Sequence, residues 1–334
     1  MKTSKITQKV RQFVLTHDFI YSTISFSRKF PFKFIRKHFR EQFIRTHFGV
    51  LEPRTSFGPE RVDIETTSIC NTSCYFCPHS KMKREKKHMS DAIFNKSLEE
   101  IKKHNVKNVS VSFMGEPLID PKFFERVKKI KDSYECTTFI STNALQLTKE
   151  KSLRMIESKL DTIIISLDGV DQDSFSKIRE GSFEKTVRNI EELISLKEKM
   201  KSETPYITLR IMVSSENKKD TKRFIERWEG KVNEIAFGKV HTWCEGGIKK
   251  SLNSPCLFLW STLLILSNGD VVPCCMDYEG KLKLGNIMEN SLEEIWNGEK
   301  IKMLRRQHIN KKFSGICATC DINDGTIVKW WSYE

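Results

Sequence analysis

From about residue 60 onward, short apolar runs alternate with longer stretches in which apolar positions recur at helical spacing. Short runs rich in β-branched and aromatic residues predict strands, and the longer amphipathic stretches predict helices. Strands are expected near residues 61–66, 108–114, 137–142, 162–167, 207–213 and 234–240. Helices are expected near residues 91–104, 121–132, 148–158, 183–199 and 219–229. This alternation is typical of βα units around a parallel sheet and predicts an α/β fold.

The alternation stops after residue 240. A hairpin is expected over residues 258–273, turning at Asn268-Gly269, and a helix near residues 291–306. These elements predict a small C-terminal α+β domain. We therefore expect an N-terminal extension at 1–58, a βα domain at 59–240 and a second domain at 241–334.

Unusual sequences fall where the predicted strands end. Functional side chains of parallel βα barrels come from the loops that leave this edge of the sheet. The first four strands are followed or closed by Cys70, Gly115-Glu116-Pro117, Ser141-Thr142-Asn143 and Ser166-Leu167-Asp168-Gly169. We expect these groups to meet in space.

The chain has 334 residues, of which 38% are hydrophobic, so it can bury a sizeable core. No stretch approaches the roughly 18 consecutive apolar residues of a membrane span, which excludes a transmembrane protein. The N-terminus lacks the apolar core and cleavage site of a secretory signal, so a cytoplasmic location is expected. Ten cysteines in that reducing compartment predict metal or redox chemistry rather than disulfides.

Most of the net charge of +14 lies at the N-terminus. Residues 1–48 hold eleven Lys or Arg against two acidic residues, about +9, and nine of the 22 Phe. Residues 32–43 predict a basic amphipathic helix. Three interpretations stay open: docking on the main domain with solvated charges, contact with an acidic partner or the inner membrane surface, and nucleic-acid binding. No recognised nucleic-acid module accompanies the charge, so nucleic acid is not an expected partner.

The first cysteine group is Cys70-x3-Cys74-x2-Cys77. Thiolates at this spacing can converge on one soft metal centre. Three thiolates leave one iron of a cubane without a protein ligand, as a reactive site needs. A zinc site would require a fourth ligand, for which His79 is the nearest candidate.

The second group is Cys256-x17-Cys274 with Cys317-x2-Cys320. Four thiolates can close a metal site, and on spacing alone zinc and an iron–sulfur cluster are equally good interpretations. Cys275 is an extra thiol beside this set, and Cys244 lies where the two predicted domains meet.

The first cysteine group and the strand-end motifs, taken in order, resemble the radical SAM superfamily over about residues 60–325. The matching pieces are Cys70-Asn71-Thr72-Ser73-Cys74-Tyr75-Phe76-Cys77, Met114-Gly115-Glu116-Pro117-Leu118, Ser141-Thr142-Asn143, Ile165-Ser166-Leu167-Asp168-Gly169 and a later strand with Arg210. The resemblance implies a partial (β/α)6 barrel with a [4Fe-4S] cluster on Cys70, Cys74 and Cys77. Its open iron would chelate S-adenosylmethionine (SAM).

The resemblance also implies which residues contact SAM. Gly115, Glu116 and Pro117 would receive the methionine amino group, and Ser166 with Arg210 would hold the carboxylate. Phe76 would lie near the adenine, and Asn143 near the ribose or carboxylate.

The C-terminal segment is similar to the SPASM extension of radical SAM enzymes, or to its shorter twitch form. No cysteine follows Cys320, so the resemblance implies one auxiliary [4Fe-4S] cluster, on Cys256, Cys274, Cys317 and Cys320. A fully ligated cluster suits electron transfer and favours net oxidation.

The expected activity is reductive cleavage of SAM to a 5′-deoxyadenosyl radical that abstracts hydrogen from a carbohydrate or other small metabolite. An alternative is a peptide- or protein-modifying maturase, of the natural-product or sulfatase-activating type. An alternative of another class is a zinc-binding interaction module. A flavodoxin or ferredoxin is the expected reductant, since charge complementarity speeds encounter with a basic surface. No catalytic base can be identified.

Overall fold

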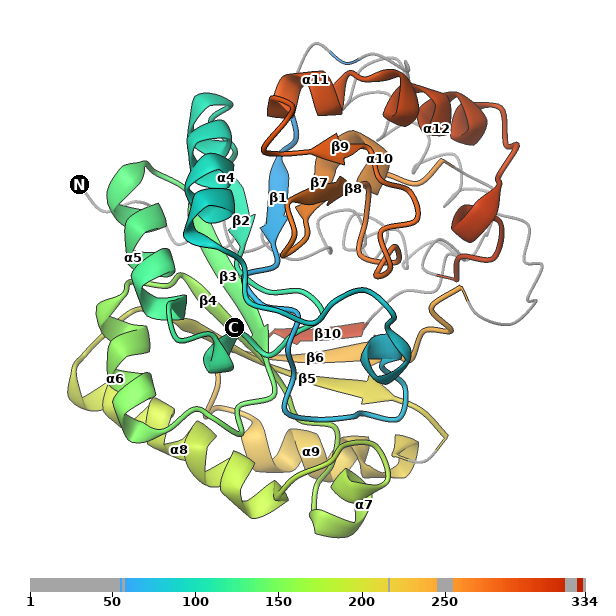
Figure 1. The fold of residues 1–334 in the computed structure, drawn as a ribbon. Helices are drawn as coiled ribbons and strands as arrows, with labels where there is room; N and C mark the ends of the chain where they lie inside the picture. The colour runs from blue at the N-terminus through green and yellow to red at the C-terminus, as the bar shows by residue number, and fades with distance from the viewer. Residues whose placement is uncertain (1–54, 56–57, 216, 245–254, 322–328, 333–334) are drawn as a thin grey trace.

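A computed structural model describes residues 55, 58–215, 217–244, 255–321 and 329–332. A ten-stranded sheet runs through them in the order β10-β6-β5-β4-β3-β2-β1-β7-β8-β9 (Figure 1). All six predicted barrel strands are confirmed, and neighbours among them pair in parallel. They are β1 (Arg61–Ile64), β2 (Asn108–Ser110), β3 (Thr137–Thr142), β4 (Thr162–Ser166), β5 (Tyr206–Val213) and β6 (Glu234–Lys239).

The five predicted helices are also confirmed. They are α4 (Asp91–Lys103), α5 (Phe123–Ser133), α6 (Lys149–Glu157), α8 (Phe183–Lys199) and α9 (Thr221–Trp228). Ser90, Thr148 and Ser182 cap α4, α6 and α8, because each side chain accepts a backbone N–H from the first turn. The short helix α7 (Gln172–Ser176) escaped prediction because five residues carry too little periodicity.

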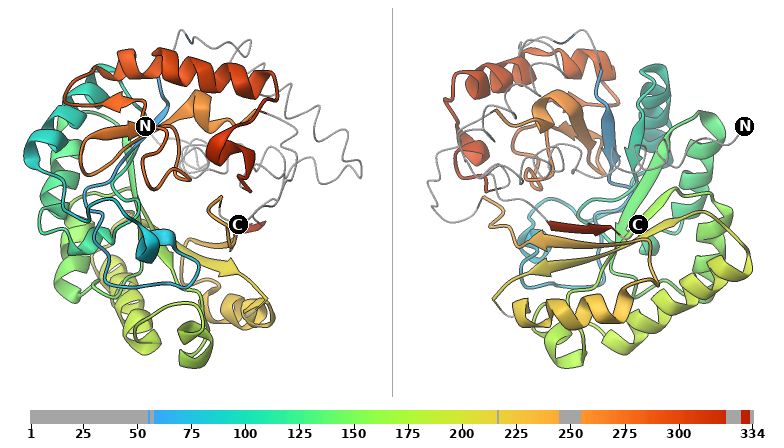
Figure 2. Two further views of the ribbon diagram at one scale, coloured as in Figure 1. Left: turned by 45° about the vertical axis from the view of Figure 1, so that its right-hand side comes forward. Right: turned by 180° about the vertical axis from the view of Figure 1, so that it is seen from behind.

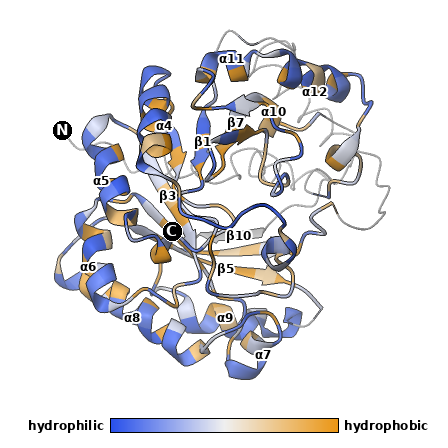
Figure 3. Cartoon of the chain, viewed as in Figure 1, coloured by the Kyte–Doolittle hydropathy of each residue, from blue (hydrophilic) through white to orange (hydrophobic). Residues whose placement is uncertain are grey.

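The helices α4 to α9 lie along the outer side of the curved sheet, and the loop between β1 and α4 crosses its inner side (Figure 2). Apolar residues concentrate on the strands and on the helix sides that face them (Figure 3). Ile64, Ile140, Ile165 and Leu209 are fully buried members of this core. None of the described helices is both long and apolar enough to cross a membrane.

The C-terminal part departs from prediction in two places. Residues 258–261, expected as strand, form the short helix α10 (Phe258–Ser261), so the hairpin contains only β7 (Thr262–Ile265) and β8 (Asp270–Val272). The helix expected near 291–306 is two helices, α11 (Leu292–Trp296) and α12 (Glu299–Ile309), with Gly298 capping the second. Gly298 has extended backbone angles (φ −71°, ψ 162°), which end the helical run, and a Cβ atom there would come within 2.7 Å of the Glu294 carbonyl oxygen.

The remaining elements are short. They are β9 (Gly285–Asn286), β10 (Lys329–Ser332) and the 3-10 helices η2 (Pro78–Lys81), η3 (Pro117–Ile119), η4 (Lys218–Asp220) and η5 (Gly315–Ala318).

The barrel sheet and the C-terminal part are continuous. Strand β7 pairs in parallel with β1, from Arg61 opposite Thr262 to Ile64 opposite Ile265. At the other edge, β10 pairs antiparallel with β6. The domain limits at 58/59 and 240/241 stay predictions, and the basic helix near 32–43 lies outside the described residues.

Candidate functional site

The loop after β1 carries the first cysteine group and folds tightly on itself. The Thr72 hydroxyl oxygen lies 3.4 Å from the Cys70 sulfur and 3.7 Å from the Cys74 sulfur. The Cys77 N–H donates to the Cys74 carbonyl at 3.0 Å. Burial raises the pKa of Cys70, and raises that of Cys77 to about 11. Thiolates here therefore need a positive partner, which an iron–sulfur cluster would supply.

Arg179, just beyond α7, is a site residue that the sequence analysis missed. One guanidinium nitrogen lies 3.3 Å from the Cys74 sulfur, and Nε binds Asp168 at 2.5 Å. Burial lowers the pKa of Arg179, but Asp168 and the thiols outweigh it, so the net shift is upward. Asp168 also accepts the Met212 N–H at 2.6 Å. Strand β4, strand β5 and the cysteine loop are thereby held together.

Gly115 lies against the backbone of the cysteine loop. A Cβ atom there would come within 2.3 Å of the Thr67 carbonyl oxygen and 2.6 Å of the Ile69 carbonyl oxygen. The next residue, Glu116, donates its backbone N–H to Ile69 at 2.9 Å. Only glycine allows this approach, which sets the start of the cysteine loop against the end of β2.

The Glu116 side chain anchors the same corner. Its carboxylate accepts from the Thr142 hydroxyl at 2.6 Å, the Asn143 N–H at 2.8 Å and the Leu118 N–H at 3.0 Å. Burial raises the pKa of Glu116 despite these hydrogen bonds. All three contacts of the Glu116 carboxylate are made within the protein. The backbone of residues 115–117 is called the rim of the site below.

Two further predicted residues meet as expected. Ser166 and Arg210 are register partners on β4 and β5, and an Arg210 guanidinium nitrogen donates to the Ser166 hydroxyl at 3.0 Å. Asn143 donates from its amide to Asn71 in the cysteine loop at 2.8 Å. A hydroxyl, a cation and an amide thus stand at neighbouring strand ends, a donor set suited to a carboxylate.

Phe76 joins the cysteine loop to the segment after β6. The Arg179 guanidinium lies 5.7 Å from the centre of its ring. The Phe76 carbonyl accepts the Trp243 indole N–H at 2.7 Å.

Four cysteines of the second group line one small cavity between α10, β8, α12 and η5. The thiols of Cys256, Cys274, Cys317 and Cys320 share it with apolar side chains and His308. Burial and neighbouring thiols raise the pKa of Cys274 well above its usual range, and burial raises that of Cys317 to about 12. Four crowded thiols in an apolar cavity fit a soft metal centre.

His79 is the nearest candidate for a fourth zinc ligand in the first group, and only its Nδ1 remains available for a metal. The His79 ring is buried and its Nε2 is 2.9 Å from the Ser68 carbonyl oxygen. Among the described residues, no three His, Cys, Asp or Glu side chains stand close enough to hold a single metal ion. The fit to clusters therefore rests on shared burial, on the contacts above and on the cavity.

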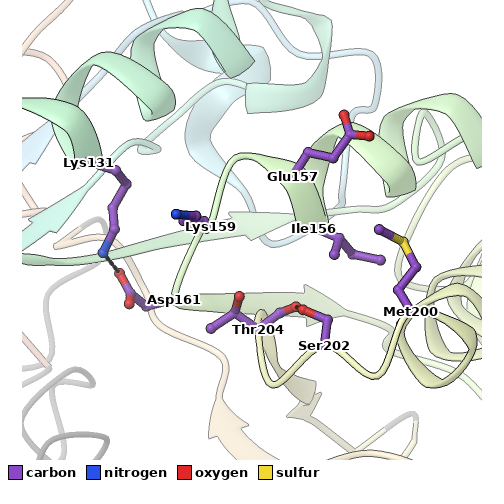
Figure 4. Close-up of a pocket in the computed structure, with 8 residues that line it drawn as sticks. All are labelled: Lys131, Ile156, Glu157, Lys159, Asp161, Met200, Ser202 and Thr204. Atoms are coloured by element: carbon purple, nitrogen blue, oxygen red, sulfur yellow. Dashed lines mark hydrogen bonds and ion pairs between the residues drawn. The ribbon is translucent and has the colours of Figure 1, made fainter.

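A wider pocket lies at the other end of the strands, around their N-terminal ends. Lys131, Lys159, Asp161 and Thr204 are among its lining residues, and Lys131 is paired with Asp161 at 2.6 Å (Figure 4). These residues surround the points where strands begin. None of the predicted site residues lines it.

Two family models match the chain. The model of the radical SAM superfamily matches residues 64–227, which include the first cysteine group and the strand-end motifs. The chain belongs to the radical SAM superfamily. A model described as an iron–sulfur cluster-binding domain, SPASM, matches residues 256–321. The protein is therefore a radical SAM enzyme with a C-terminal SPASM/twitch domain, and the resemblance seen in the sequence is confirmed.

One curated relative is the S-adenosyl-L-methionine-dependent 2-deoxy-scyllo-inosamine dehydrogenase of Niallia circulans. It is 23% identical over 274 residues, 78% of this chain and 92% of the relative.

Two solved structures show the same fold. BtrN in complex with AdoMet and 2-DOIA is 17% identical, with a TM-score of 0.56 over 79% of this chain and 93% of that chain. Streptococcus suis SuiB bound to precursor peptide SuiA is 16% identical, with a TM-score of 0.56 over 87% of this chain and 74% of that chain.

The two matching domains imply three kinds of cofactor: a SAM-binding [4Fe-4S] cluster, auxiliary iron–sulfur clusters and SAM itself. The expected fold class is confirmed as well.

Proposed function

We propose that this radical SAM enzyme dehydrogenates a hydroxyl- or amine-bearing carbon of a carbohydrate or related small metabolite. The observation that carries the proposal is the set of four thiols around one cavity, because a fully ligated cluster offers electron transfer rather than substrate binding. A relative that is a dehydrogenase, matched over 92% of its length, supports the same choice.

The proposed ligands follow the two cysteine groups. Cys70, Cys74 and Cys77 hold the SAM-binding cluster, and Cys256, Cys274, Cys317 and Cys320 hold one auxiliary cluster. When bound, the first cluster supplies the electron that cleaves SAM, and the auxiliary cluster takes up the electron that substrate oxidation releases. The substrate loses one hydrogen atom and one proton as well, which completes a two-electron oxidation.

The chain's own residues bind and orient SAM. Arg210 and Ser166 hold its carboxylate, and their mutual hydrogen bond and paired positions on β4 and β5 support this assignment because they place a cation and a hydroxyl side by side. The backbone of Gly115 and Pro117 receives the amino group at a rim that Glu116 keeps rigid. Asn143 approaches the ribose or carboxylate and Phe76 the adenine. Arg179 holds the Cys74 sulfur in place.

Anaerobic reconstitution tests the cluster assignment. Wild type should bind about eight irons per chain, and a Cys70/Cys74/Cys77 triple alanine variant about four, with loss of 5′-deoxyadenosine formation under dithionite. About four irons and one zinc in wild type, with SAM cleavage kept, would remove the auxiliary redox role. Wild type without iron or cleavage would contradict the whole proposal.

Deuterium transfer tests the substrate class. With 2-deoxy-scyllo-inosamine or hexosamines deuterated at the reacting carbon, label should appear in 5′-deoxyadenosine and the product should be two hydrogens lighter. Transfer from peptides alone would instead establish the maturase alternative; a protein of the same fold, SuiB, is known bound to precursor peptide SuiA.

The reductant is proposed to be an acidic flavodoxin or ferredoxin. The net charge of +14 supports it. The rate of cluster reduction should fall as salt rises from about 0.05 to 0.5 M, since screening shortens the reach of charges. A rate insensitive to salt would refute electrostatic docking.

The protein is also proposed to be cytoplasmic and to contact the inner membrane surface through residues 1–58. Sedimentation with anionic vesicles, against a chain lacking residues 1–54, tests it. Equal sedimentation of the two chains would refute the contact.

A further inference from the structure

His308, in the last turn of α12, lines the cavity that the four thiols of the second cysteine group share. The residue is only 2% exposed. Apart from the cysteines, the other lining residues are Leu259, Pro273, Met276 and Ile316. Among the described residues around this cavity, His308 is therefore the one whose side chain contains a nitrogen or oxygen atom.

The His308 ring is held from two sides. Its Nδ1 accepts the backbone N–H of Cys256 at 3.1 Å. The ring of Phe313 packs against it nearly at a right angle, with 4.8 Å between the ring centres. The imidazole is thus fixed both by the segment that carries a proposed cluster ligand and by the chain that follows α12.

The contact with Cys256 also determines which ring nitrogen carries the proton. A backbone N–H can only donate, so Nδ1 must accept and has no hydrogen of its own. The proton of the imidazole is then on Nε2. This tautomer argues against His308 as an iron ligand, because Nδ1 is already engaged and a ligating Nε2 would have to lose its only proton.

The Nε2–H group is buried, and it has no hydrogen-bond acceptor within the part of the chain that the structure describes. Buried donors in native proteins are nearly always satisfied by the protein, by water or by a bound group. The iron–sulfur cluster-binding domain matches residues 256–321, which include every residue that lines this cavity. A cluster bound there would bring sulfur atoms, which accept hydrogen bonds.

We propose that His308 donates its Nε2–H to a sulfur of the auxiliary cluster and thereby raises the reduction potential of that cluster. The inference rests on the auxiliary cluster of the proposed function. A hydrogen bond to sulfur stabilises the more negative, reduced state more than the oxidised state, and apolar surroundings strengthen it. The cluster then more readily accepts the electron that substrate oxidation releases.

Three substitutions separate the roles of the two ring nitrogens. Asparagine places its amide oxygen near the position of Nδ1, so His308→Asn keeps an acceptor for Cys256 and removes the donor. Glutamine is longer and places an amide N–H near the position of Nε2, so His308→Gln restores the donor. His308→Leu removes both groups. His104→Asn, at the end of α4 and not among the residues that line the cavity, is the control.

Redox titration followed by electron paramagnetic resonance measures the effect. The parent is the full chain with Cys70, Cys74 and Cys77 replaced by alanine, so that only the auxiliary cluster contributes. His308→Asn and His308→Leu should each lower the ratio of reduced to oxidised cluster about tenfold at a fixed potential, a shift of about 59 mV for a one-electron couple. His308→Gln and His104→Asn should keep the parent potential.

A purely structural role predicts the opposite order. If His308 served only to accept the Cys256 N–H, asparagine would restore the parent potential and glutamine would not, and this result would overturn the proposal. An unchanged potential in all three variants would also overturn it and would leave the face of Phe313 as the partner of Nε2–H.

Iron analysis separates this inference from the proposed function. A parent without iron contradicts the auxiliary cluster, and the inference fails with it. About four irons in the parent, together with loss of iron in all three His308 variants, keeps the cluster but shows that the ring is needed for assembly rather than for tuning.

A second measurement examines the nitrogen itself. With isotopically labelled histidine nitrogen in the parent, pulsed electron paramagnetic resonance of the reduced cluster should detect a weakly coupled nitrogen that disappears in His308→Leu. A strongly coupled nitrogen would show direct ligation to iron, and no coupled nitrogen would place the ring away from the cluster. Either result would contradict the donor role.

Discussion

Arg179 shows how one side chain serves two purposes. Its guanidinium satisfies buried Asp168 with one nitrogen and the Cys74 sulfur with another, and it lies over Phe76. Hydrogen bonds to ligand sulfurs are among the features that set cluster potentials. A planar fork can make both contacts, whereas a lysine ammonium is a single point of charge.

Arg179→Lys should therefore keep the ion pair with Asp168 and lose the contact with Cys74. The cluster should still assemble, but its reduction potential should fall by about 60 mV, equivalent to a hydrogen bond of about 1.4 kcal/mol. Redox titration followed by electron paramagnetic resonance measures this. Arg223→Lys, at an exposed ion pair, is the control. An unchanged potential in Arg179→Lys would show that the contact does not tune the cluster.

At the scale of elements, the rim of the site depends on how closely one loop approaches another. The backbone at Gly115, after β2, lies against the start of the cysteine loop, after β1. Glu116 then ties the same corner to Thr142 at the end of β3. The segments that follow three neighbouring strands are therefore joined to one another.

Gly115→Ala should disturb the packing of these segments, because the added carbon would lie 2.3 Å from the backbone oxygen of Thr67, which cannot rotate away. We expect a loss of about 1–3 kcal/mol in the free energy of unfolding and weaker retention of the first cluster. Chemical denaturation and iron analysis measure the two effects. Gly58→Ala is the control, since its Cβ would meet nothing within 4 Å. Equal stability of the two variants would contradict the argument.

At the scale of the whole molecule, the barrel and the C-terminal part share more than a sheet. Glu100 on α4 accepts the Leu292 N–H at the start of α11 at 2.9 Å, and Lys96 lies 3.1 Å away. Burial raises the pKa of Glu100, but these two hydrogen bonds outweigh it, and the net pKa is lowered. A carboxylate of the barrel thus accepts an N–H from the first turn of a helix in the C-terminal part, where Ser291 is the N-cap.

Because the folded-state pKa of Glu100 lies below its ordinary value of 4.5, its stabilisation is present above that pH and disappears as the pH falls through the lower value. Glu100→Gln should cost about 1 kcal/mol of unfolding free energy at pH 7, and the difference from wild type should narrow below pH 4.5. Urea denaturation across pH measures it. Glu99→Gln, on the exposed side of α4, should change little. A cost independent of pH would refute the electrostatic origin.

The six barrel strands, the five long helices and the family could all be predicted from the sequence. Their apolar periodicity is local, and the cysteine spacings and strand-end motifs are contiguous in the chain. The meeting of Ser166 with Arg210 was also predictable, since parallel strands bring their ends to one edge.

The sequence did not predict that β7 pairs with β1, that Arg179 contacts Cys74 or that the Trp243 indole binds the Phe76 carbonyl. Each of these contacts joins residues 105 to 201 positions apart in sequence. No local pattern encodes such a contact, because it depends on how the sheet curves and on where separate loops pack. The residue types and their spacing therefore predicted the chemistry. Which of these groups contact one another could be seen only in the folded structure.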